Sequence, residues 1–149
     1  MFKSIFFFFA LALSVEGADI LKLVGMLDRN DTTAFIESIQ TINDANSARE
    51  DNNKTILMYA CWVGNIGAVK HLVAKGADIN AEDSGGATAL HLAVWKNHTP
   101  IALYLIENGA SASVISKDGM TPLDVALMRE NQEIVKAIKK MAPKLKKLL

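Results

Sequence analysis

Residues 88–110 read TALHLAVWKNHTPIALYLIENGA, and the same pattern recurs on both sides of this stretch. Thr55, Thr88 and Thr121 each open one copy, and neighbouring copies begin 33 residues apart. A leucine lies two positions after each threonine and an alanine five positions after it, so the three copies agree in register. A fixed period of this length indicates a solenoid of stacked repeats.

Each copy contains the start and stop signals of two short helices. Thr121 is followed by Pro122, and a threonine hydroxyl can cap a helix whose first turn tolerates proline. After a polar break, apolar residues return at helical spacing until Gly76 or Gly109, where glycine can adopt the left-handed conformation that closes a helix. The polar residues 78–86 then predict a projecting turn. A helix pair this short cannot bury its apolar face alone, so the pairs must stack.

In these residues the chain resembles the ankyrin-repeat family. The resemblance implies an all-α ankyrin-repeat solenoid of about four stacked helix-turn-helix repeats with β-turn fingers, in which His91 ties a helix start to a neighbouring loop. We expect repeats at about 18–49, 50–82, 83–115 and 116–149, with atypical ends and an interruption of the last helix at Pro143. The matching segments are Thr88-Ala89-Leu90-His91 with Ala93, Thr121-Pro122-Leu123-Asp124 with Ala126, and, more loosely, Thr55-Ile56-Leu57-Met58 with Ala60.

The first residues, MFKSIFFFFALALSVEGA, are organised as a secretory signal peptide. Lys3 precedes an apolar run from Ile5 to Leu13 that has about half of the roughly 20 residues a membrane helix needs. We therefore expect residues 1–17 to be removed and the protein to be soluble and exported, periplasmic or secreted, meeting a membrane only transiently. An uncleaved anchor is the alternative. Small residues suited to cleavage are Ser14, Gly17 and Ala18.

The sequence contains no group of residues suited to catalysis or metal binding. His71, His91 and His98 lie at different repeat positions, without a cysteine or carboxylate at metal-ligand spacing. The single cysteine, Cys61, permits no internal disulfide and occupies a slot that is apolar in the other copies, so we expect a buried thiol. These observations predict a protein without enzyme activity, metal or cofactor.

A ladder of large side chains is the candidate binding site. Trp62, Trp95 and Met128 lie seven residues after their threonines, outside the leucine and alanine slots that close the core. The resemblance implies that this slot and its neighbours face the concave groove and the finger bases, and tryptophan is frequent at binding hot spots. Packing between repeats is the alternative interpretation. The candidate partner-binding residues are Trp62, Val63, Trp95, Lys96, Met128, Arg129, Lys54, Asp51, Ser84 and Lys117.

The charges sum to zero but are distributed unevenly. Acidic side chains outnumber basic ones in residues 18–53, and the reverse holds in residues 116–149. The basic end could meet nucleic acid, anionic lipid or an acidic protein, although a solvated capping face is the simplest interpretation. Export and the lack of aromatic residues among the lysines argue against nucleic acid, so we expect no nucleic-acid partner.

The sequence leaves the identity of the partner open. We expect a monomer that binds another protein through its concave face. Exported ankyrin-repeat proteins of this size resemble accessory factors that support a partner enzyme and immunity-type proteins that block a toxin. The alternative is an envelope-associated scaffold held at the membrane by an uncleaved signal segment or the basic tail. A host-directed effector or a eukaryotic secretory protein would share these features.

Overall fold

The computed structural model describes residues 19–145, and side chains are described for residues 19–141. The predicted signal peptide, residues 1–17, and the end of the basic tail, residues 146–149, lie outside the described residues. Within the described range there are nine helices and no strand, which confirms the all-α prediction. The helices are α2 (Ile20–Asp28), α3 (Thr32–Ser38), α4 (Ile42–Ala45), α5 (Ile56–Val63), α6 (Ile66–Ala74), α7 (Ala89–Trp95), α8 (Thr99–Glu107), α9 (Pro122–Met128) and α10 (Gln132–Leu145).

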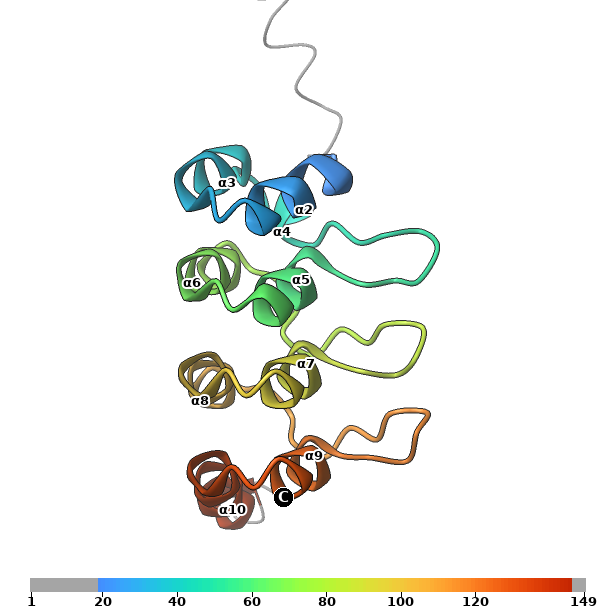
Figure 1. Ribbon diagram of the computed structural model, residues 1–149, viewed down its shortest axis with the longest axis vertical. Helices are drawn as coiled ribbons and strands as arrows, with labels where there is room; N and C mark the ends of the chain where they lie inside the picture. Colours follow the sequence, from blue (N-terminus) through green and yellow to red (C-terminus); the bar gives the residue numbers. More distant parts are fainter. Residues whose placement is uncertain (1–18, 146–149) are drawn as a thin grey trace, which may run out of the picture.

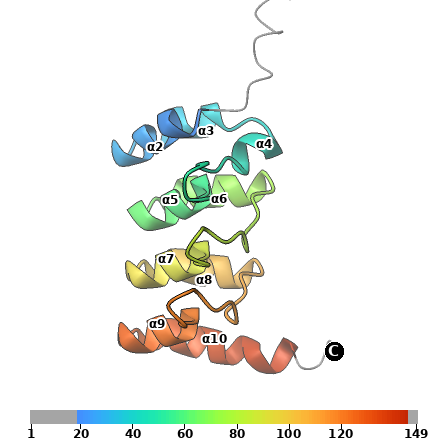
Figure 2. The ribbon, with the colours of Figure 1, turned by 90° about the vertical axis from the view of Figure 1, so that its right-hand side faces the viewer.

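Four helix pairs stack on one another to form an elongated solenoid (Figure 1). The first helices of the pairs, α2, α5, α7 and α9, form one layer, and the second helices, α3, α6, α8 and α10, form a layer beside it. The loops that join successive pairs project as fingers on the side of the first helices that faces away from the second helices. Figure 2 shows the same stack from the finger side.

The predicted start and stop residues lie at the helix ends. Thr55 and Thr121 are N-caps, and each hydroxyl oxygen accepts a hydrogen bond at 3.2 Å from the backbone amide three residues later. Gly76 and Gly109 follow α6 and α8 with φ of 89° and 93°, so both adopt the left-handed conformation that favours glycine. The solenoid therefore has its boundaries where the sequence signals them.

The helices differ from expectation in two places. The short helix α4 was not predicted, and it begins where the Thr41 side chain and the Asp44 carboxylate form a capping box. Helix α10 continues through Pro143 to Leu145 instead of being interrupted there. Pro143 lies close to the end of this helix, where its missing N–H forfeits one hydrogen bond without separating two long helical segments.

The core lies between successive pairs, and its completeness depends on having a neighbour on both sides. Leu57 and Leu90 are fully buried, as expected from their repeat position, but Leu123 in the last pair is only partly buried. Cys61 is also buried, and burial raises the pKa of its thiol, as expected for an inert side chain. The equivalent Leu127 is 48% exposed because no described repeat follows it.

Side-chain hydrogen bonds hold neighbouring repeats in register at the start of the second helices. The Asn65 Nδ2 amide donates to Thr32 Oγ1 at 2.7 Å, and one double period later Asn131 makes the same bond to Thr99. His98 replaces asparagine in the intervening copy, and its Nε2–H donates to the backbone carbonyl of Trp62 at 3.3 Å. The start of α8 is thus hydrogen-bonded directly to the end of α5, where Trp62 lies.

Candidate partner-binding groove

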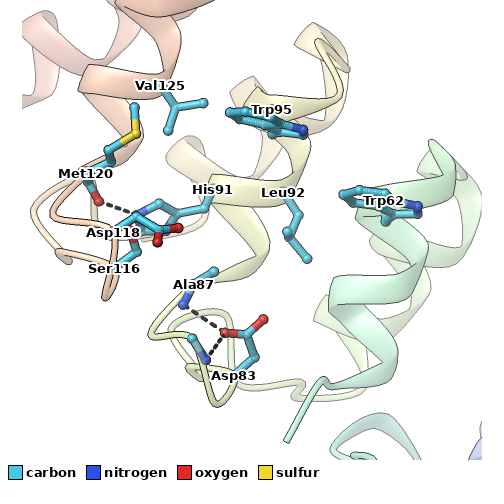
Figure 3. A pocket seen from close by; sticks show the side chains of 11 residues that line it. Trp62, Asp83, Ala87, His91, Leu92, Trp95, Ser116, Asp118, Met120 and Val125 are labelled. Atoms are coloured by element: carbon cyan, nitrogen blue, oxygen red, sulfur yellow. Dashed lines mark hydrogen bonds between the residues drawn. The ribbon is translucent and has the colours of Figure 1, made fainter. Parts of the chain in front are cut away.

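A pocket of about 320 Å³ lies between the first-helix layer and the fingers (Figure 3). Its side chains come from α5, α7 and α9 and from the two fingers that precede α7 and α9. The pocket lies on the finger side, and partner binding at this surface stays a prediction. The lining residues are Trp62, Asp83, Gly85, Ala87, His91, Leu92, Trp95, Ser116, Asp118, Met120 and Val125.

The ladder side chains are exposed. Trp62 is 39% exposed, Trp95 44% and Met128 51%, in contrast to the leucine and alanine slots of the same helices. Figure 3 shows the two indoles side by side along one edge of the pocket. Met128 does not line the pocket, so the structure brings together two of the three ladder residues.

Basic side chains lie over the indoles. The Lys96 Nζ is 4.2 Å from a ring centroid of Trp62, and the Lys54 Nζ is 5.6 Å from it. The Arg129 Cζ lies 5.9 Å from the ring of Trp95. Exposed cation–π pairs of this kind contribute about 0.5–1 kcal/mol and restrict the orientation of the ring. These contacts restrict the orientation of the two indoles, and all three basic residues were among the predicted partner-binding residues.

The apolar floor of the pocket was missed by the sequence analysis. Leu92 and Val125 form it, and both are buried at its base. They lie four residues after Thr88 and Thr121, in the slot that Tyr59 occupies in the preceding copy. The same slot lies three residues before the tryptophans, hence on the same helix face. This spacing was the signal that could have identified the floor.

The finger side of the pocket is polar. One carboxylate oxygen of Asp83 accepts hydrogen bonds from the Gly85 and Ala87 amides at 2.8 and 3.0 Å, and this closes the tip of the finger. Asp118 comes from the next finger and is exposed. The pocket thus has an aromatic edge, an apolar floor and a carboxylate on each of two neighbouring fingers.

The predicted finger residues lie outside the pocket lining. Asp51 pairs with Arg49 at 2.6 Å, and this hydrogen-bonded pair lowers the pKa of the Asp51 carboxyl. Ser84 and Lys117 are exposed, and the amide of each donates to the preceding finger at 2.8 Å, to Asn52 and Gly85 respectively. The backbone at these positions links the fingers into a row. Val63, at the end of α5, is half-buried and also outside the lining.

His91 joins the pocket wall to the next finger and confirms the expected structural role. Its Nδ1 accepts from the Thr88 amide, and its Nε2–H donates to the Met120 carbonyl, both at 3.1 Å. A backbone amide can only donate and a carbonyl can only accept, so the ring is the neutral Nε2–H tautomer. Burial lowers the pKa of His91. At the same position Asp124 makes the local bond to the Thr121 amide, at 2.8 Å.

Mild acidification is expected to destabilise the protein through His91. Because its pKa is lowered in the folded state, the unfolded chain takes up a proton first as the pH falls. The stabilisation is complete above the unfolded pKa of about 6.5 and is lost as the pH falls towards the folded pKa. We therefore expect a lower urea midpoint at pH 5.5 than at pH 7.5, with a smaller difference in His91→Gln.

Carboxylates do not contribute to the difference between these two pH values. The carboxyls with a lowered pKa, Asp51 and Asp124, lose their contribution to stability only below about pH 4. A wild-type midpoint that is the same at the two pH values would contradict the assignment of a buried neutral His91. An equal decrease in the wild type and in His91→Gln would place the proton uptake on another group.

No group of three or more histidine, cysteine or acidic residues is arranged to hold a metal ion in the part of the chain that the structure describes. Among the same residues, no helix is long and apolar enough to cross a membrane.

The comparison with protein families agrees with this geometry. Residues 11–116 and 84–147 match the family model described as ankyrin repeats (3 copies). The two matched segments overlap and together cover most of the chain. No curated protein matches the chain.

Proposed function

Because the chain belongs to the ankyrin-repeat family, we propose that it is an exported interaction protein that binds a partner protein through the groove between its first helices and fingers. Ankyrin repeats generally mediate protein–protein interaction and are typically not enzymes. We propose further that the protein is a monomer. It serves either as an accessory factor for a partner enzyme or as an immunity-type factor against a toxin.

One observation carries this proposal: two tryptophans are exposed side by side at the edge of an open pocket, over a buried apolar floor. Exposed apolar patches with a polar rim are typical of protein–protein interaction sites, and tryptophan supplies much contact area with few rotatable bonds. Hot spots combine such anchors with surrounding polar contacts. Lys96, Arg129 and the carboxylates Asp83 and Asp118 provide those polar groups around the indoles.

The proposed export rests on residues 1–17 and on their charge and apolar pattern. We expect a mature chain that begins after Ser14, Gly17 or Ala18. N-terminal sequencing of protein taken from its native compartment measures this directly. An intact Met1, or fractionation wholly with membranes, would contradict export as a cleaved protein and favour the envelope-associated scaffold.

The function is tested by capture of partners from an extract of the native envelope or secretion compartment, with the purified chain as bait. A matched bait carries Trp62→Ala and Trp95→Ala, so that non-specific proteins appear with both baits. The proposal predicts a protein that is retained only by the wild-type bait. Its identity then separates the two finer roles, because an enzyme that gains activity indicates an accessory factor and a toxin that loses activity indicates an immunity-type factor. Equal recovery of every protein on both baits would contradict the groove as the binding face.

A further inference from the structure

The pocket has an uneven charge distribution that restricts what it can bind. Two of the described residues that line it are carboxylates, Asp83 and Asp118, and none is a lysine or arginine. His91 is the remaining titratable group in the lining, and both of its ring nitrogens are engaged as a neutral tautomer. The pocket interior is therefore acidic, although the basic Lys54, Lys96 and Arg129 lie nearby over the indoles.

The two carboxylates are not equivalent. Asp83 uses one oxygen to hold the Gly85 and Ala87 amides, and its other oxygen points away from them (Figure 3). Asp118 is exposed, and the described residues supply neither a hydrogen bond nor an ion pair to its carboxylate. Asp118 is thus the group with both oxygens available to a guest.

The rest of the lining suits a long side chain with a planar cation. Leu92, Val125 and Met120 offer apolar surface for an alkyl stem, and the indoles offer π-faces. Trp95 has its own cation at 5.9 Å, the outer end of the range for this interaction, so a closer guanidinium can improve on it. A guanidinium also pairs with a carboxylate through two parallel hydrogen bonds, which an ammonium cannot do.

We propose that the pocket receives an arginine side chain of the partner, with its guanidinium on the Asp118 carboxylate and its stem along the apolar floor. This inference rests on the proposed function, since it takes the groove as the face that meets the partner. An acidic side chain is disfavoured there because it would meet two carboxylates of like charge.

The test uses capped tripeptides, acetyl-Ala-X-Ala-amide, added to the ¹⁵N-labelled full chain and followed by NMR. The sequence has two tryptophans, so the indole N–H signals of Trp62 and Trp95 are two direct reporters on the pocket edge. The residue X is arginine, its neutral isostere citrulline, lysine or glutamate. We expect saturable shifts of the indole signals with arginine, and binding about tenfold weaker with citrulline, the factor that accompanies loss of one charge-assisted hydrogen bond.

Asp118→Asn is expected to weaken binding of the arginine peptide about tenfold while leaving the spectrum of the free protein otherwise unchanged. Glu37→Gln removes the same charge on α3, in the second-helix layer and away from the fingers, and should leave the affinity unchanged. Added salt should weaken the arginine peptide and have little effect on citrulline.

Equal binding of arginine and citrulline, or lysine binding as tightly as arginine, would overturn the proposal, as would preference for glutamate or an Asp118→Asn variant that binds like the wild type. These failures are distinguishable from failure of the proposed function. If the arginine peptide does not bind but a captured partner still requires the tryptophans, the groove remains the docking face and the arginine inference alone is wrong.

Discussion

Replacing Leu90 by alanine is expected to lower the free energy of unfolding by about 2–5 kcal/mol, the range for truncating a large, fully buried aliphatic side chain. Leu90 has no exposed surface, and its helix, α7, lies between α5 and α9 in the first-helix layer. A repeat protein is stabilised largely by contacts between neighbours, so a cavity in a central repeat weakens the contacts on both sides. Urea denaturation followed by circular dichroism measures the change.

Leu127→Ala provides the matched control, because it makes the same chemical change in α9 at a side chain that is 48% exposed. We expect this variant to lose less than about 1 kcal/mol, as is usual for substitutions at exposed positions. Similar losses in the two variants would contradict the assignment of the core face, and so would a Leu90→Ala midpoint that equals that of the wild type.

Periodicity explains why most of the fold could be predicted from the sequence. The threonine caps, the closing glycines and the leucine slots all recur at 33 residues, so each copy supports the assignment of the others. The last repeat follows the pattern in sequence but not in burial: Leu127 matches the slot of Cys61 yet remains exposed, because burial depends on whether a further repeat follows. The short helix α4 has no counterpart in the other copies, and its only signal was the capping pair Thr41 and Asp44.

The candidate site was predictable only where its residues obey the repeat. Trp62 and Trp95 share one slot, and their cations Lys96 and Arg129 share the next, so periodicity placed all four together. Asp83 and Asp118 occupy different slots on different fingers, where the neighbouring copies have serine and glycine, Ser116 and Gly85. Both carboxylates line one pocket because the two fingers stack, and the repeat pattern of the sequence does not show that they are close together.

The second large effect is expected from Trp62→Ala combined with Trp95→Ala. Both indoles keep more than a third of their surface exposed, so their truncation removes less packing than truncation of a fully buried tryptophan. The truncation also removes the pairing with Lys54, Lys96 and Arg129, at about 0.5–1 kcal/mol for each cation–π contact. We therefore expect the double variant to unfold cooperatively, with a smaller loss of stability than two fully buried tryptophans would give. A fully buried tryptophan would cost about 3–5 kcal/mol for each truncation.

Binding to the partner should respond much more strongly than stability. Truncating a hot-spot residue lowers the binding free energy by at least about 2 kcal/mol, which corresponds to a roughly 30-fold larger dissociation constant. Tyr104→Ala is the control for removing an aromatic ring, since Tyr104 pairs with Lys70 at 5.7 Å in the second-helix layer, away from the fingers. This control should leave partner binding unchanged.

The decisive measurement is calorimetric titration of the captured partner into the wild-type chain, the double tryptophan variant and Tyr104→Ala, each first shown to be folded. Binding through the groove predicts a loss of at least about 2 kcal/mol for the double variant alone. A folded double variant that binds the partner as tightly as the wild type would contradict the central claim that the exposed tryptophans form the binding surface.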